Sequence, residues 1–350
     1  MRLIYLTKYP IREGDTLESV AEKLKIQTEY LKEVHNAKAG FWDKIRRNRF
    51  PKHLTEIYVY SDVSPGQSPE KLVQRETGRN LFPVRFYTSK TYGYTFENYE
   101  GDLLKSKIHY EVDVVYKKND FNFKIIEINR RQVYINQKMP DVAVEQLLDK
   151  IAQNIFPIAL EISNTGEIKG IVNHSEIKKR WTANKEELTH YYKKEQSDTI
   201  IKKADQYFNN EKVLLKMLSK NWFFNLFFKP IYGNYPEKKE IQYTAKVPFL
   251  SKRLLEYEIT QTLKDLYTKS GKLIINHIAK ITDERTIDEV LQNKTVLEKD
   301  RPNIQIIQSE GNVQYKLNSS DNSIFSIIGT FSTKMNNEKI NKIQVEIYQQ

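Results

Sequence analysis

The chain has 350 residues, which allows two or three domains rather than one small module. It contains 56 lysines and arginines against 45 aspartates and glutamates, a formal net charge of +11, and it contains no cysteine. The lack of cysteine excludes disulfides, thiolate zinc sites and cysteine nucleophiles. The most apolar short run, residues 222–228, is far below the roughly 20 residues that span a bilayer.

The positive charge is spread along the chain, mostly as lysine with glutamate in between. No recognised nucleic-acid-binding motif accompanies this charge, so we do not expect nucleic acid as a partner. The first residues also lack the apolar stretch and the cleavage site of a secretory signal. We therefore expect a cytoplasmic protein without a membrane span.

The first sixty residues carry the local signals of a strand, two helices and a second strand. Gly14 suits a tight turn with positive φ. Asp15 or Thr16 can cap a helix, and Glu18 stands three residues after Asp15, as in a capping box. The predicted elements are a strand over 3–10, a helix whose apolar face is Leu17, Val20, Ala21 and Leu24, a helix from Thr28 to Val34, and a strand over 56–60.

This segment resembles a LysM module, through Gly14, Asp15, Thr16 and Leu17 followed by a helix and, later, by Asn36. The resemblance implies a βααβ fold over residues 1–62. It also implies binding of glycans that contain N-acetylglucosamine, such as peptidoglycan or chitin, in a shallow groove between two loops. By this resemblance, the same five residues would line the glycan-binding groove.

The loop after the second helix is longer than the LysM pattern. Between residues 38 and 52 it holds six basic residues and one acidic residue, a charge of +5. Two interpretations remain open. In one, the loop docks on a partner, since Trp and Arg are enriched at interface hot spots. In the other, Phe41, Trp42 and Ile45 only anchor the loop. The candidate docking residues are Phe41, Trp42, Arg46, Arg47 and Arg49.

The rest of the chain is predicted as a linker and one large domain. Residues 63–82 contain two prolines and a glycine among polar residues, which is typical of a linker. Strand patterns fill 83–172, helical patterns fill 174–229, and strand patterns return over 241–348. The expected fold class is therefore α+β: the βααβ LysM module, then a mixed domain over 83–350 of antiparallel sheet with long helices packed on one face.

The densest aromatic segment lies over residues 222–228. Two interpretations are open here as well. The segment is either the buried end of a long helix or an apolar surface for a partner protein. In the second case Trp222, Phe224 and Phe228 are the candidate docking residues.

No catalytic motif stands out. The six histidines do not pair at metal-ligand spacing. The nucleophile elbow, Walker and Rossmann patterns are absent, and nothing selects a carboxylate pair. We expect no catalytic residue, no metal and no cofactor.

Three functions are then considered. The first is a non-catalytic adaptor or assembly protein, such as a baseplate, spike or effector-loading factor of a contractile injection system (type VI secretion or phage-tail-like). Its partner would be a protein of that machinery or an effector. The second function is peptidoglycan binding. The third is an undetected cell-wall hydrolase or toxin.

Overall fold

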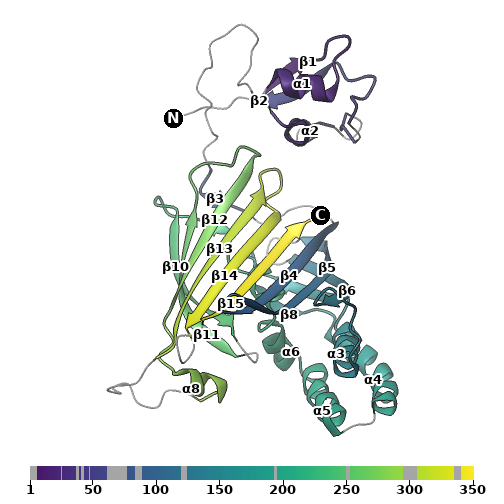
Figure 1. Ribbon diagram of the computed structural model, residues 1–350, viewed down its shortest axis with the longest axis vertical. Coiled ribbons are helices and arrows are strands. Elements are labelled where there is room, and N and C mark those ends of the chain that lie inside the picture. Colours follow the sequence, from purple (N-terminus) through teal and green to yellow (C-terminus); the bar gives the residue numbers. More distant parts are fainter. Residues whose placement is uncertain are drawn as a thin grey trace. The chain divides into compact units, whose positions relative to one another are not determined.

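The computed structural model (Figure 1) describes residues 6–24, 26–36, 39–40, 43–46, 48–60, 77–82, 89–119, 124–192, 195–249, 253–294, 306–334 and 340–350. The chain divides into two compact units. The first comprises Met1–Gly78, Lys264–Ile274 and Asn318–Ser320, and the second comprises Arg79–Leu263, Ile275–Leu317 and Asp321–Gln350. Each domain was predicted as one continuous stretch of sequence, whereas the first unit also includes two short segments from later in the chain, Lys264–Ile274 and Asn318–Ser320.

The first unit begins with four short elements. They are β1 (Leu6–Pro10), α1 (Leu17–Lys23), α2 (Thr28–Asn36) and β2 (Glu56–Tyr60), and β1 pairs antiparallel with β2. Thr16 caps α1 by accepting a hydrogen bond from the backbone N–H of Ser19, whose own hydroxyl accepts one from the backbone of Thr16. The capping box is therefore Thr16 with Ser19, not Asp15 with Glu18. The fully buried side chains include Leu17, Val20, Leu31, Ile45 and Ile57.

The second unit is built on one eleven-stranded sheet with the order β10-β11-β12-β13-β14-β15-β4-β5-β6-β7-β8. Two sets of consecutive strands meet where β15 pairs antiparallel with β4, at positions such as Ile347 and Tyr94. A separate two-stranded sheet joins β3 (Asn80–Leu81) to β9 (Gly233–Asn234). The strands are β4 (Ser89–Glu100), β5 (Leu103–Asn119), β6 (Lys124–Ile135), β7 (Ile158–Ile162), β8 (Ile168–Ile171), β10 (Glu240–Pro248), β11 (Leu254–Leu263), β12 (Lys272–Ile281), β13 (Gln308–Asn318), β14 (Ile324–Lys334) and β15 (Ile340–Gln349).

The predicted fold class is wrong, because the protein is mostly this one large antiparallel sheet rather than a LysM module followed by a sheet covered by long helices. Four of the helices that the structure describes lie in the connection between β8 and β10, which are the two edge strands. They are α4 (His174–Tyr191), α5 (Glu195–Asn209), α6 (Glu211–Leu218) and α7 (Trp222–Phe227). α3 (Ala143–Gln153) and α8 (Ile287–Leu291) lie in other connections.

The long helices bury their aromatic side chains against each other. The rings of Trp181 in α4 and Phe208 in α5 stack with their centroids 4.6 Å apart. The Trp181 indole N–H also donates a hydrogen bond to Asp205 in α5 at 2.7 Å. Figure 1 shows α4 and α5 beyond the end of the sheet, in contrast to the predicted packing on its face.

The short helix α7 packs its aromatic rings on the sheet. Phe227 meets Tyr92 of β4 edge-on at 5.1 Å, and Trp222 meets Phe331 of β14 at 4.9 Å. Asn221 caps the helix by accepting hydrogen bonds from the backbone N–H groups of Phe223 and Phe224. The prediction of long helices over 174–229 thus missed a break that places this aromatic turn against the strands. Among the described residues, no helix is long and apolar enough to cross a membrane.

Candidate functional site

The predicted groove residues of the first unit all belong to local structure. Gly14 lies at φ +85° in the turn before α1, and Leu17 is fully buried. The Asp15 carboxylate accepts hydrogen bonds from the Lys23 ammonium and, at 2.9 Å, from the backbone N–H of Arg12. The Lys23 hydrogen bond, with that from Arg12, lowers the pKa of Asp15. Thr16 is the helix cap described above, so these side chains are used to build the turn.

Asn36, the fifth groove candidate, holds the loop that follows α2. Its side-chain N–H donates to the backbone oxygen of Ile45 at 2.9 Å, and its side-chain oxygen accepts from the backbone N–H of Ile45 at 2.7 Å. The neighbouring ring of His35 contacts the backbone oxygen of Asp43 and accepts from the backbone N–H of Tyr58. The buried Ile45 side chain anchors the loop. This supports the anchoring interpretation for Ile45.

The candidate docking residues have three different outcomes. Phe41, Trp42 and Arg47 lie outside the described residues, and Arg46 and Arg49 are exposed. The three aromatic candidates are buried, with 7% of Trp222, 4% of Phe224 and 8% of Phe228 exposed. These three do not form an exposed docking surface, because α7 turns them into the interior of the second unit.

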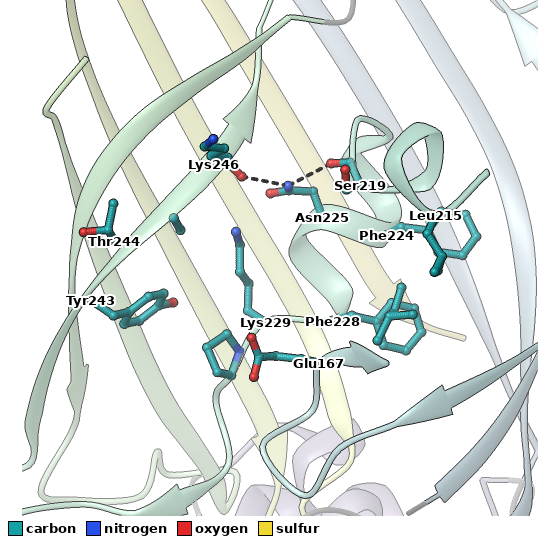
Figure 2. Close-up of a pocket in the computed structure, with 13 residues that line it drawn as sticks. Glu167, Leu215, Ser219, Phe224, Asn225, Phe228, Lys229, Tyr243, Thr244 and Lys246 are labelled. Atoms are coloured by element: carbon teal, nitrogen blue, oxygen red, sulfur yellow. Dashed lines mark hydrogen bonds between the residues drawn. The ribbon is translucent and has the colours of Figure 1, made fainter. Parts of the chain in front are cut away.

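A pocket lies beside α7, in the second unit (Figure 2). Its volume is about 360 Å³. Both edge strands of the large sheet contribute to its lining, β8 at Ile168 and β10 at residues 243–246, and the turn after α7 adds residues 228–230. Phe224, Phe228 and Leu215 provide an apolar wall. The helical connection between the two edge strands therefore creates a half-open pocket that the sequence prediction did not contain.

Lys229 is the central charged residue of this pocket. Only 9% of it is exposed, and Figure 2 shows its side chain extending between Tyr243 and Asn225. Burial lowers its pKa from 10.5 to about 8, and the charge of Glu167 opposes this change. Within the described part of the chain, the Lys229 ammonium has no hydrogen bond and no ion pair within 4 Å.

Two further polar atoms in the pocket lack a hydrogen bond among the described residues: the side-chain oxygen of Asn225 and the hydroxyl of Tyr243. The orientation of the Asn225 amide is fixed, because its N–H₂ group donates to the backbone oxygens of Ser219 and Lys246, both at 3.0 Å (Figure 2). A flipped amide would place its oxygen against two carbonyl oxygens, so the free atom is the acceptor.

Polar side chains also lie deeper, behind Tyr243. The ring of His277 lies edge-on to that of Tyr243 at 6.3 Å, and its Nε2 atom has no hydrogen-bond partner among the described residues. Burial, with the charge of Lys229, lowers the pKa of His277 to about 3, so this histidine is neutral. Gln261 donates to the Tyr235 hydroxyl at 2.7 Å while its own side-chain oxygen is unpartnered. The interior near Lys229 is therefore polar on one side.

A second candidate surface lies on α3. One fully buried residue, Leu147, fixes the helix, whereas Val144 and Leu148 are 43% and 47% exposed. Met139 and Val142, just before the helix, are 61% and 56% exposed. Val144 and Leu148 are four residues apart and share one helical face. We call these four residues the α3 surface.

No residue of the pocket or of the α3 surface was predicted as a site except Phe224 and Phe228. The one signal for the pocket was a lysine directly after an apolar run, at Lys229. Among the described residues, no group of three or more histidine, cysteine, aspartate or glutamate side chains could hold a metal ion.

No protein-family model matches the chain, and no curated protein matches it. Solved structures with some resemblance include one described as lipid-protein interactions in lipovitellin. The sequence identity is 10%, the TM-score is 0.41, and the match covers 75% of this chain and 25% of the other. The chain thus spans about a quarter of that solved chain, and the similarity is too low to support a functional argument.

Proposed function

We propose that this protein is a non-catalytic adaptor that binds another protein through the α3 surface. The observation that carries the proposal is the burial pattern of α3. An amphipathic helix normally turns its apolar stripe toward the core, yet this helix leaves Val144 and Leu148 open to solvent. Apolar side chains that gather on an exposed surface mark protein-protein contacts more often than chance.

The contact chemistry follows from these side chains. Valine, leucine and methionine offer an apolar centre, and Arg130 fixes the helix beneath it through an ion pair with Asp149. A partner would contribute a matching apolar segment, as in helix-in-groove recognition. The partner that we propose is a component or an effector of a contractile injection system. We further propose that residues 1–62 of this chain form a LysM-like module.

Glycan binding has less support as the alternative. The side chains of Asp15, Thr16, Leu17 and Asn36 are used in a salt bridge, a helix cap, the core and a loop anchor. A glycan ligand would have to bind chiefly through backbone groups of this turn. Sedimentation of the purified protein with insoluble peptidoglycan that is lost when Asp15 and Leu17 are changed in a still-folded protein would contradict the adaptor proposal as the sole function.

The adaptor proposal predicts a loss of partner recovery. Tagged protein is recovered from its own host, and any protein present in a stoichiometric amount is identified. The double substitution Val144→Gln and Leu148→Gln should reduce that recovery at least tenfold, because two apolar contacts are removed at the centre of the surface. Exposed substitutions of this kind change stability by about 0.5 kcal/mol or less, which circular dichroism checks.

The matched control is Ile278→Gln. This residue is 50% exposed on β12, so it removes a similar apolar group at another place. Recovery should stay as in the unchanged protein. Equal recovery with the double α3 variant, or loss with Ile278→Gln as well, would reject the α3 surface as the docking site.

A further inference from the structure

We propose that the pocket beside α7 binds a small molecule with one carboxylate group, an apolar body and a hydrogen-bond donor. The carboxylate pairs with the Lys229 ammonium. The Tyr243 hydroxyl donates a second hydrogen bond to it, and the side-chain oxygen of Asn225 accepts from the donor on the ligand. This site is independent of the α3 surface and adds a second binding activity to the proposed adaptor.

The first step of the argument is the charge of Lys229. An ammonium buried without a partner costs several kcal/mol, and a carboxylate in contact with it offsets this cost. The side chain is nine-tenths buried and reaches into a volume of about 360 Å³ (Figure 2). A charged end that points into a partly open pocket is suited to an ion of opposite sign, which can enter from solvent.

The second step decides the charge of the ligand. Glu167 also lines the pocket, and its carboxylate interacts with Lys229 through space. The other cation of the lining, Lys246, is exposed to solvent. One buried cation with a nearby carboxylate cannot balance a dianion, so the pocket favours a monoanion over a phosphate group.

The third step concerns the rest of the ligand. Phe224, Phe228 and Leu215 form an apolar wall, so an aliphatic or aromatic body would be buried there. The oxygen of Asn225 has a fixed orientation and can only accept, which selects for a hydroxyl or amine on the ligand. The volume lies at the small end of the range for ligand pockets, which fits a hydroxy or amino acid with one apolar side group.

The test uses the full chain and five probes: acetate, octanoate, phenylacetate, 3-phenyllactate and phenylacetamide. Binding is measured by ligand-observed NMR and by titration calorimetry at pH 7. We expect 3-phenyllactate to bind best and phenylacetate to bind at least tenfold more tightly than phenylacetamide, its neutral analogue. Lys229→Met should weaken carboxylate binding at least tenfold, whereas Lys246→Met should change it less than twofold.

The pH dependence gives an independent readout. The titratable groups that line the pocket or lie behind its wall are Lys229, Glu167, Tyr243, Lys246 and His277. Burial raises the pKa of Tyr243, and His277 is already neutral, so neither changes charge between pH 7 and 9. Lys229 loses its proton above about pH 8, and carboxylate affinity should fall as the pH rises through that value.

Three outcomes would overturn the proposal. They are no binding by any carboxylate to a protein that circular dichroism shows to be folded, equal binding of phenylacetate and phenylacetamide, and unchanged binding in Lys229→Met. The first outcome means that the pocket holds water only. Lys229→Met keeps the length of the side chain and removes a buried charge, so its fold should persist and the comparison remains decisive.

Discussion

Replacing Gly311 with alanine should lower the free energy of unfolding by about 2–3 kcal/mol, the upper part of the range for an overpacked core. A Cβ atom at this position of β13 would overlap the ring of Phe331, its partner across the strand pair, and would come 3.2 Å from the Cβ of Ala279. Phe331 is only 4% exposed and is held by Trp222 at 4.9 Å and Tyr257 at 6.0 Å. The ring therefore has nowhere to move.

Gly93 provides a matched control within the same sheet. A Cβ atom there would meet the ring of Tyr348, also its partner across a strand pair. Tyr348 is 42% exposed, so its ring can swing into solvent. Gly93→Ala should therefore cost less than about 1 kcal/mol. Urea unfolding followed by tryptophan fluorescence compares the two. Equal losses would mean that freedom of the facing ring does not decide the outcome.

Lys229→Met should stabilise the protein at pH 7 by roughly 3 kcal/mol, since each pKa unit corresponds to about 1.4 kcal/mol and the pKa falls from 10.5 to about 8. The folded state holds this proton less tightly than the unfolded state. The destabilisation is therefore complete below pH 8 and disappears as the pH rises toward 10.5. Urea unfolding at pH 7, 8, 9 and 10 measures the difference between the variant and the unchanged protein.

Lys246→Met is the control for this series. Lys246 lines the same pocket but is exposed, so its removal should change stability little, and by the same amount at each pH. A Lys229→Met protein that is less stable at pH 7, or a difference that stays constant up to pH 10, would show that burial does not penalise this ammonium.

The individual elements were largely predictable because their signals are local. Residues 56–60 match the predicted strand in full, and the strands β10 to β15 fall within the block 241–348 where strand patterns were predicted to within two residues. Strand pairing was not predictable in this way. The alternation of apolar residues in β4 and β15 does not indicate that these two strands pair, because more than two hundred residues separate them in the sequence. The error in fold class arose for a similar reason, because the helical patterns did not show that α4 and α5 lie beyond the end of the sheet and not on its face.

The pocket illustrates the same limit. Thr16 was recognised as a possible helix cap because it directly precedes the apolar face of the helix, although its partner Ser19 was not predicted. Lys229 becomes notable only when β8, β10 and α7 are placed around it, and Tyr243 faces it from another strand. The aromatic run was ambiguous for a related reason. Its composition suits both a surface and a core, and the position of α7 against Tyr92 decides for the core.

The join between β15 and β4 has a consequence for how the sheet assembles. Each half can form from contacts between neighbouring strands, at low loop-closure cost. The pairs that unite the halves, such as Asn341 with Glu100, close a far longer loop. During synthesis β15 is the last of these strands to leave the ribosome. Until then β4 and β14 each present an unpaired edge that neighbouring chains could extend, so nascent chains are most prone to aggregate just before residues 340–349 emerge.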